Sequence, residues 1–555
     1  MKHLVTLSLV ALLLTASLSC VSAAVPPSSP PVSVTPAADI VFTSTRQVTS
    51  LTALPDGTLW VGTSGGVLRR SNEGVWRKWT RLDGLPAHEV RSIDVGADGA
   101  VTVTVPRKTV AWRDETWIAQ PEPAATAAAQ AVSDEEPRGE GETCRAVWRG
   151  APVIATLSGL HVGHKNGQQV PLPPASRGTH ISALLPRGET LWVALFGDGL
   201  WTWDGNVWKA ANVGLPPEAR EITALAAYGG TLWVGTRRAG VWQREGGKEG
   251  LWAQHLQPDE PFDHNVQALA MQDGALLVST LEDGLAVRDE RGWRRETPSA
   301  LSSDAPRQMV GFGGALYLRH GNGKVDRLEG DGKTWTRNVL PNLPRKQVSA
   351  LAADEKRLYV AQWGGWSEWD GANWTHRLNL SELQGLPITA FLPDGDTLWV
   401  GTQGRGLAEI QRATGRFVRW HDERHGLPDD WITALTRVGD TVCVGAFVGG
   451  LARWNGSKWT SPSELAGQNV TALEPDGAGG MFIATRAGVW HRSATGAMKP
   501  LGKRFPFLDT EAQALLRSLE DNNGLWVATR TGLFFVRVTL SEQTVLVASE
   551  KDAPR

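Results

Sequence analysis

An all-β fold built from propeller blades is the class that this sequence predicts, on three observations. A short apolar string related to LWVGT occurs twelve times. Its copies follow one another at intervals of about 42 residues, and the composition combines 61 Gly and 32 Pro with 26 Trp. A sustained period of about 40–45 residues is typical of four-stranded propeller blades. We therefore predict twelve four-stranded blades, closed as two propellers because propellers usually have about four to eight blades.

Each repeat contains the signals of four strands in order. The first strand alternates apolar and polar residues, as in ITALAAY at 222–228. A turn such as Asp56-Gly57 then allows the positive φ that a tight hairpin requires. The LWVGT strand follows, a Gly-containing turn precedes the third strand, and a turn such as WDGNVW opens the fourth. The core strands are expected at 59–63, 101–105, 153–157, 191–195, 232–236, 276–280, 316–320, 358–362, 398–402, 442–446, 481–485 and 525–529.

Tryptophan recurs at fixed positions of the repeat. A large flat side chain can fill the space between blades, which widens with distance from the axis. A carbohydrate-stacking platform is the alternative, but the periodicity is already explained by packing. The residues concerned are Trp192, Trp233, Trp399 and Trp526 in core strands and Trp208, Trp374 and Trp459 at the start of fourth strands.

The amino-terminal segment has the features of a secretion signal. MKH followed by an apolar run predicts a signal peptide over residues 1–23, with a Pro/Ser-rich tether over 24–39. Two processing routes stay open: cleavage after Ala23, or lipidation of Cys20 in a loose lipobox. Cys144 and Cys443 lie in distant repeats, and we expect them to be buried free thiols.

The repeat pattern I-x-A-L, D-G-x-L-W-V-G-T, x-x-G-L and G-L-P resembles the two-component regulator propeller repeat over almost all of residues 40–550. That repeat builds the extracytoplasmic sensor region of bacterial hybrid two-component systems. The family typically has two seven-bladed propellers, followed by an immunoglobulin-like domain, a membrane helix and a kinase. None of these downstream parts follows repeat 12 here, so we expect a free-standing or lipid-tethered propeller protein.

The division of the repeats is predicted as six plus six. The first propeller would cover residues 40–300 and the second 301–549, with the boundary in the polar segment 293–308. Seven plus five in either order, or a single ring, stay open. Residues 120–142 are rich in Ala, Pro and acidic residues and are expected to be a mobile insertion between repeats 2 and 3.

Candidate binding residues lie just after the core strand, where the repeats differ most from one another. Aromatic, Arg and Gln side chains dominate there and suit recognition of a sugar, a carboxylate or a peptide. Drift of solvated loop residues is the alternative interpretation. The candidates are Phe196, Asp198, Arg237, Arg238, Trp363, Gln403, Arg405, Phe447, Arg486 and Arg530.

The function predicted is a ligand-binding or sensory module outside the cytoplasm, in the periplasm, on the outer membrane or secreted. Its partners would be an oligosaccharide or peptide ligand and a membrane sensor or envelope protein. The net charge of −2 gives no reason to expect nucleic acid, and contact with the membrane would be through an N-terminal lipid only. Catalytic motifs are missing and the His clusters at 161–164 and 421–425 lack a third ligand, so we expect no catalysis, cofactor or metal. An envelope scaffold, and then a propeller lyase or hydrolase, are the alternatives.

Overall fold

The computed structural model describes residues 40–96, 99–120, 142–157, 159–163, 167–173, 176, 180–244, 252–256, 265–281, 283–296, 301–340, 343–518 and 523–538. Twelve four-stranded antiparallel sheets make up this part of the chain, and each is one blade. Short 3-10 helices lie in connections between strands, at Arg81–Asp83 (η1), Pro217–Ala219 (η2), Ser381–Leu383 (η4), Glu423–His425 (η5), Ser463–Leu465 (η6), Leu501–Lys503 (η7) and Pro506–Leu508 (η8).

Blades 1 to 5 each contain four strands that are consecutive in sequence, from the innermost to the outermost. They are β2 Val48–Ala53, β3 Leu59–Thr63, β4 Gly66–Arg70 and β5 Trp76–Trp79; β6 Ser92–Val95, β7 Val101–Val105, β8 Lys108–Arg113 and β9 Thr116–Ala119; β10 Glu142–Trp148, β11 Ala151–Thr156, β12 Gly159–Val162 and β13 Gln168–Val170; β14 Ile181–Arg187, β15 Thr190–Leu195, β16 Gly199–Trp203 and β17 Trp208–Ala210; β18 Ile222–Tyr228, β19 Thr231–Thr236, β20 Val241–Arg244 and β21 Trp252–Leu256.

Blades 6 to 11 follow the same rule, and blade 12 takes its outermost strand from the start of the described chain. They are β22 Val266–Gln272, β23 Ala275–Thr280, β24 Leu285–Asp289 and β25 Gly292–Arg295; β26 Pro306–Phe312, β27 Ala315–His320, β28 Val325–Leu328 and β29 Trp335–Thr336; β30 Leu351–Ala353, β31 Leu358–Gln362, β32 Gly365–Trp369 and β33 Trp374–Leu378; β34 Ile388–Asp394, β35 Thr397–Thr402, β36 Leu407–Gln411 and β37 Arg416–His421; β38 Ile432–Val438, β39 Thr441–Ala446, β40 Leu451–Trp454 and β41 Trp459–Thr460; β42 Val470–Pro475, β43 Met481–Thr485, β44 Gly488–Arg492 and β45 Met498–Pro500; β46 Ala512–Arg517, β47 Gly524–Thr529 and β48 Gly532–Arg537, with β1 Ile40–Phe42.

The repeat pattern is confirmed strand by strand, because every predicted core strand is the second strand of a blade. In blade 1 all five residues of β3 are buried, because the strand pairs with β2 and β4 and its faces pack against blade 5 through Leu59 and Val61 and against blade 2 through Trp60. The hairpin between β2 and β3 contains Gly57 at φ 86°, a left-handed conformation that glycine adopts without strain.

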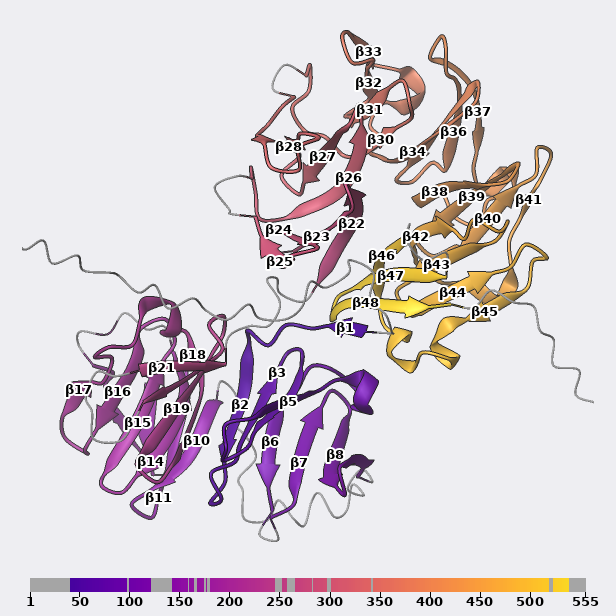
Figure 1. The fold of residues 1–555 in the computed structure, drawn as a ribbon. Helices are drawn as coiled ribbons and strands as arrows, with labels where there is room; N and C mark the ends of the chain where they lie inside the picture. The colour runs from indigo at the N-terminus through magenta and orange to yellow at the C-terminus, as the bar shows by residue number, and fades with distance from the viewer. Residues whose placement is uncertain are drawn as a thin grey trace, which may run out of the picture.

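Blade 12 joins the beginning of the described chain to its end. Ile40 pairs with Phe535 and Phe42 with Leu533, so β1 is the outermost strand beside β48. Figure 1 shows this indigo strand lying against the yellow strands of blade 12. Because the closing strand is separated from its blade by the rest of the chain, the sheet fixes both ends of the fold in one place.

The blades pack into two groups. The inner strands of blades 6 to 12 contact one another in sequence, and β22 of blade 6 also packs against β46 of blade 12, which closes a ring of seven. The inner strand of blade 5, β18, instead packs against β2 of blade 1, and Thr223 Oγ donates a hydrogen bond to the Val48 carbonyl across that contact. We call blades 1–5 the first body and blades 6–12 the second body; Figure 1 shows them as two separate groups of strands.

This packing corrects the six-plus-six division. Repeat 6 was expected in the first propeller, but β22 lies between β26 of blade 7 and β46 of blade 12. The division therefore falls between residues 256 and 265, and not in 293–308. The physical reason is the closing strand: β1 belongs to the second body, so the first body is inserted between β1 and blade 6.

The segment that follows β1 ties the two bodies together. Arg46 forms an ion pair with the buried Asp283 of blade 6 at 2.5 Å, and its Nε donates to the Arg238 carbonyl of blade 5. Nearby, Arg81 of η1 donates hydrogen bonds to the Pro506 and Phe507 carbonyls around η8 of blade 12. Arg46 and Arg81 thus make polar contacts between the bodies, with blade 6 and with the segment around η8.

His88 lies in the same junction and is buried. Its ring stands 5.6 Å from the ring of Phe534 in blade 12, and neither ring nitrogen has a hydrogen-bond partner. Burial, with the nearby charges of Arg81 and Lys78, lowers the pKa of His88 to about 3. The imidazole is therefore neutral at ordinary pH, and its protonation would oppose folding.

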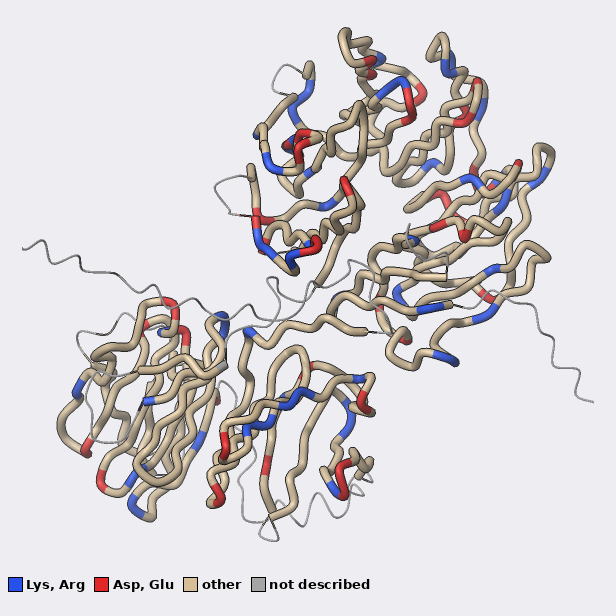
Figure 2. The backbone as a smooth tube through the Cα atoms, viewed as in Figure 1, with Lys and Arg blue, Asp and Glu red and all other residues tan. Residues whose placement is uncertain are grey.

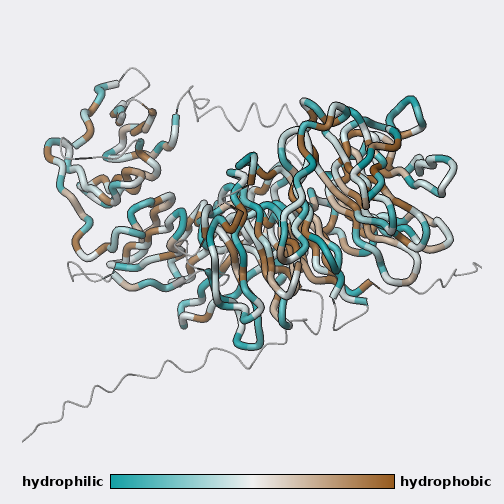
Figure 3. The backbone as a smooth tube through the Cα atoms, turned by 90° about the horizontal axis from the view of Figure 1, so that it is seen from above, coloured by the Kyte–Doolittle hydropathy of each residue, from teal (hydrophilic) through white to brown (hydrophobic). Residues whose placement is uncertain are grey.

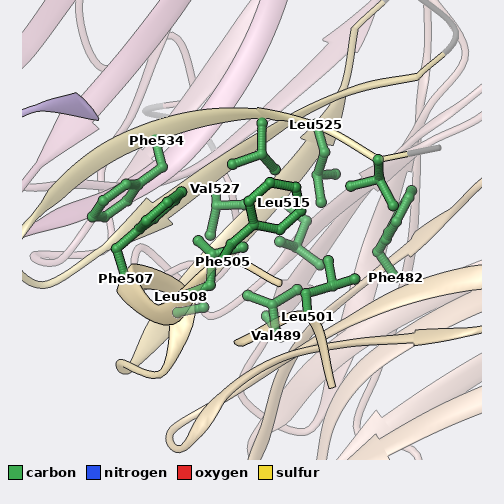
Figure 4. Close-up of a cluster of buried hydrophobic side chains, with 14 residues drawn as sticks. Phe482, Val489, Leu501, Phe505, Phe507, Leu508, Leu515, Leu525, Val527 and Phe534 are labelled. Atoms are coloured by element: carbon green, nitrogen blue, oxygen red, sulfur yellow. The ribbon is translucent and has the colours of Figure 1, made fainter. Parts of the chain in front are cut away.

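Buried apolar residues form clusters between neighbouring blades. Figure 3 colours the backbone by hydropathy, with brown segments within the blades and teal at many of the turns. The largest cluster lies between blades 11 and 12, where Phe507 stacks on Phe534 with ring centroids 5.2 Å apart (Figure 4). Two of the recurring tryptophans pack against another Trp of the same blade: Trp208 against Trp203, and Trp459 against Trp454. These rings therefore contribute to blade packing, as the periodicity indicated.

The remaining sequence expectations have varied outcomes. Cys443 is a buried free thiol whose pKa is raised by burial, whereas the free thiol of Cys144 is only half-buried. Among the described residues, no helix is both long enough and apolar enough to cross a bilayer. The signal segment, the tether with Cys20 and most of the 120–142 insertion lie outside the described residues.

Candidate functional site: an arginine-lined axial pocket

Short hydroxyl side chains join neighbouring blades around the axis. The second residue of the inner strand is Ser or Thr in seven blades, and several of these hydroxyls donate to a carbonyl of the next blade. Thr433 donates to Val470 at 2.5 Å and Thr471 to Ala512 at 2.6 Å, and Ser349, just before β30, donates to Ile388 at 2.8 Å. These hydroxyls are consumed by the scaffold.

Three adjacent blades of the second body depart from this pattern. The hydroxyl position holds Gln267 in blade 6, Arg307 in blade 7 and Gln513 in blade 12. Arg307 donates to Gln267 Oε1 at 2.5 Å, which links two of them. All three longer side chains line one cavity at the mouth of the axis. Blades 12, 6 and 7 therefore form one arc of the ring, in which these three side chains reach into the cavity.

Arg319 of β27 adds a second guanidinium to this arc. It stands in the fourth position of the core strand, where four other repeats have Gly, including Gly401 and Gly445. A Cβ built at those glycines would lie 2.8 Å and 2.5 Å from side-chain atoms of the next blade, so the position tolerates little bulk. Blade 7 places an arginine there, and the next inner strand, β30, is only three residues long.

The environment of Arg319 leaves its charge without a counter-ion. Its Nε donates at 3.4 Å to Gln308 Oε1, which also accepts the Leu351 backbone N–H. Burial, followed by the neighbouring charge of Arg307, lowers the pKa of Arg319 to about 10. No carboxylate among the residues lining the cavity pairs with it. The guanidinium is held near a like charge in a partly desolvated place, which opposes folding.

The opposite side of the cavity is aromatic. The rings of Trp431 and Phe447 are stacked, with centroids 4.1 Å apart and planes inclined by 12°. The Phe447 backbone N–H donates to the Trp431 carbonyl at 3.0 Å, which fixes the two residues relative to each other. Arg486 Cζ lies 5.7 Å from the Phe447 ring centroid, on the next blade. This side presents flat apolar surface together with a cation.

One carboxylate stands beside this cluster. Glu511 accepts from Arg530 at 3.3 Å and from Gln513 at 3.0 Å, and Arg486 Nε approaches it at 3.6 Å. Both arginines are exposed, so each of these ion pairs is weak. The cavity lining includes three arginines, Arg307, Arg319 and Arg486, and no carboxylate, so it carries net positive charge.

These groups surround a cavity of about 560 Å³. Its wall also includes Gly321, Thr433, Asn469 and Thr471. The lining is mainly polar, with Trp431 and Phe447 as its apolar part, and the volume lies in the usual range of small-molecule sites.

Only some of the predicted binding residues of the second body line this cavity. Phe447 and Arg486 line the cavity, and Arg530 shares Glu511 with Arg486. Gln403 is bridged to Trp431 through the backbone and is exposed. The lining does not include Trp363, whose side chain is 55 % exposed, or Arg405, which lies over the Trp420 ring at 4.9 Å.

Candidates from repeats 4 and 5 belong to the first body and take no part in this cavity. Phe196 stacks on His180, and Arg237 lies 6.0 Å from its ring centroid. Asp198 accepts a hydrogen bond from Trp201 Nε1 at 2.8 Å. The Arg238 carbonyl accepts from Arg46 at the junction. Asp198 and the Arg238 backbone therefore have structural contacts, and none of these four candidates lines the cavity that contains Phe447 and Arg486.

Sequence reasoning missed the residues that give the cavity its character: Gln267, Arg307, Arg319, Trp431 and Gln513. A signal for most of them was available. Comparing the hydroxyl position of I-T-A-L among the repeats singles out Gln267, Arg307 and Gln513. Comparing the Gly of LWVGT singles out Arg319 in LYLRH. Trp431 stands before the inner strand, in a connection whose sequence varies too much for comparison.

The histidine clusters have structural contacts. His421 Nε2 pairs with Glu409 at 3.0 Å, and its Nδ1 accepts from Trp459 Nε1 at 3.1 Å. His425 pairs with Asp422 at 2.6 Å within η5. No group of three or more His, Cys, Asp or Glu side chains able to hold a metal occurs within the described ranges. His164 lies outside them.

Comparison with known proteins identifies the fold. The chain matches no protein-family model. It also matches no curated protein. Among solved structures, the GH74 enzyme of Niastella koreensis aligns with 89 % of this chain and 82 % of its own, at 12 % identity and a TM-score of 0.51.

Two bacterial surface proteins align over a similar length. The extracellular domain of the hybrid two-component system BT4673 from B. thetaiotaomicron covers 89 % of this chain and 70 % of its own, at 14 % identity and a TM-score of 0.43. PorZ of Porphyromonas gingivalis, a component of the type-IX secretion system, covers 91 % and 88 %, at 13 % identity and a TM-score of 0.35. At such identities the likeness to the GH74 enzyme defines the fold class alone, an all-β protein of propeller blades.

Proposed function

We propose that this chain is an extracytoplasmic ligand-binding propeller protein with a sensory role, and that its ligand enters the axial pocket of the second body. The observation that carries the proposal is the cavity of about 560 Å³ in which a stacked Trp431–Phe447 pair faces Arg307 and Arg319. Most other repeats have small residues at the positions of Arg307 and Arg319, so these two long, charged side chains serve a purpose other than blade packing.

The place of action follows from the sequence. The predicted signal segment directs the chain out of the cytoplasm, and the repeat resembles that of extracytoplasmic sensor regions. A membrane sensor or envelope protein would receive the signal when the ligand is bound. Lipidation at Cys20 would hold the protein at a membrane and is part of this proposal.

A thermal-shift screen against oligosaccharides and peptides tests the proposal. A compound that binds only the folded state raises the melting temperature, and the stabilisation grows with the logarithm of the ratio of its concentration to the dissociation constant. Gly321→Phe supplies the comparison variant, because a Cβ at Gly321 would meet Arg307 at 3.5 Å without a clash and the ring would then occupy part of the cavity. We expect at least one class to stabilise the wild type but not this variant. Equal stabilisation of both proteins by every active compound would contradict the proposal.

An envelope scaffold is the second candidate function. Trp363 and Val448 are 55 % and 56 % exposed on blades 8 and 10, and exposed apolar side chains of this size can dock a protein partner. Catalysis is not favoured, because the residues that line the cavity include no Asp, Glu or His to act as general acid or base.

A further inference from the structure

Charge at the axial pocket points to the chemistry of its ligand. Arg307 and Arg319 lie on one blade, and the nearby Glu511 is already shared by Arg486 and Arg530. Most other repeats have Ser or Thr at the position of Arg307 and a small residue at the position of Arg319. The two guanidinium groups of blade 7 are instead kept together without a carboxylate.

The hydrogen-bonding capacity of these groups is largely unused. Arg307 donates to Gln267, and Arg319 makes one long hydrogen bond to Gln308. A planar guanidinium has five N–H donors arranged to fit two oxygen atoms of a carboxylate, sulfate or phosphate group. Their N–H groups are therefore available to an anionic group that enters the cavity.

Across the cavity, the Trp431–Phe447 stack supplies flat apolar surface next to Arg486. The faces of saccharide rings carry C–H groups that pack on such surfaces, while Asn469 and the glutamines can exchange hydrogen bonds with hydroxyl groups. A ligand with one ring and one anionic group satisfies both sides of the cavity at once.

We propose that the axial pocket binds an anionic saccharide, with its carboxylate or sulfate between Arg307 and Arg319 and a ring against Trp431 and Phe447. This inference rests on the proposed function and specifies its ligand class. The lowered pKa of Arg319 supports it, since an anion would supply the counter-charge that the folded chain lacks.

The test uses three probes on the whole secreted chain: trigalacturonate, its fully methyl-esterified form, and a sulfated disaccharide. Calorimetric titration at constant ionic strength measures each dissociation constant. The methyl ester keeps the rings and removes the charge, so it separates recognition of a saccharide from recognition of an anion. The two charged probes separate carboxylate from sulfate.

Arg307→Gln and Arg319→Gln are the test variants, and Lys458→Gln is the matched control, because Lys458 is exposed in a turn at the outer edge of blade 10. We expect a charged probe to bind the wild type at least tenfold more tightly than the ester, and each arginine variant to lose tenfold or more of that affinity. Lys458→Gln should bind like the wild type.

Two results would overturn the inference. Equal binding of the ester and the acid, with both arginine variants unaffected, would show a pocket for neutral saccharides and leave the proposed function standing. Failure of all three probes to bind would reject this ligand class, and the proposed function would then be judged by the Gly321→Phe screen. A wild-type melting curve in both arginine variants shows that lost affinity is not lost folding.

Discussion

Replacing Arg319 with methionine is expected to stabilise the second body while it weakens anion binding. Burial lowers the pKa of Arg319 from 12.5 to about 10. For a base, a folded-state pKa below the unfolded value means that the charged form opposes folding. This penalty is fully present at every pH below the folded-state pKa, and so at neutral pH, and it disappears only when the pH rises above the unfolded value.

The size of the effect follows from the shift. At about 1.4 kcal/mol per pKa unit, the charge of Arg319 opposes folding by on the order of 3 kcal/mol. Methionine has similar length and no charge, but it cannot donate to Gln308 and must fit a position that is Gly in other repeats. We therefore expect a gain of about 1–3 kcal/mol in the free energy of unfolding, or about 2–6 °C in the melting temperature of the second body.

Differential scanning calorimetry of the wild type, Arg319→Met and Arg319→Lys at neutral pH measures the effect. The lysine variant keeps the charge and should not gain stability. Sulfate at constant ionic strength should stabilise the wild type more than the methionine variant, since only the wild type has the buried charge to neutralise. A melting temperature of Arg319→Met below that of the wild type would refute the reasoning, because the charge would then be compensated in the fold.

Three further predictions concern the junction and the blades. His88→Leu should reduce the acid sensitivity of folding. Because the pKa of His88 is about 3, the free energy of unfolding of the wild type should fall by about 1.4 kcal/mol per pH unit between about pH 6 and 3. Urea denaturation at pH 7 and pH 4 measures this loss, and an equal loss in the wild type and the variant would contradict the prediction. Arg46→Ala should lower the free energy of unfolding by about 1–3 kcal/mol and separate the melting of the two bodies, since the buried Asp283 would keep its ion pair with Arg295 alone. The control Arg77→Ala breaks an exposed pair with Glu115 and should cost under about 1 kcal/mol. A single unchanged transition of Arg46→Ala in calorimetry would contradict the prediction. Gly445→Val should destabilise the second body by about 1–3 kcal/mol, because even a Cβ there would lie 2.5 Å from Val470 Cγ1. If chemical denaturation shows the variant to be as stable as the wild type, blades 10 and 11 pack less closely than the structure indicates.

The blades could be predicted from the sequence because their signals are local. A strand such as LWVGT at 59–63, its turn at Gly57 and its alternating neighbour at 48–53 each depend on residues close in the chain. Ring closure depends on contacts such as Ile40 with Phe535, which join distant segments that no repeat marks. The six-plus-six division failed for that reason.

The site was predicted in part for a related reason. Phe447 and Arg486 follow core strands, where variation between repeats is easily seen. Arg307 and Arg319 lie within strands, at positions that the repeat reserves for a small residue, and their exposure to the axis becomes evident only when the ring is assembled. Candidates in the first body could not be separated from those in the second without the packing of β22.

The central claim is that ligand binds in the axial pocket of the second body, and fluorine NMR of protein labelled with 5-fluorotryptophan tests it most directly. The resonance of Trp431, assigned through Trp431→Phe, reports on the pocket wall, while Trp60 and Trp79 report on the first body. Titration with the charged saccharide that binds most tightly should shift the Trp431 resonance to saturation and leave the resonances of Trp60 and Trp79 unchanged. Saturable shifts of Trp60 and Trp79 with an unmoved Trp431 resonance would place the ligand elsewhere and contradict the account.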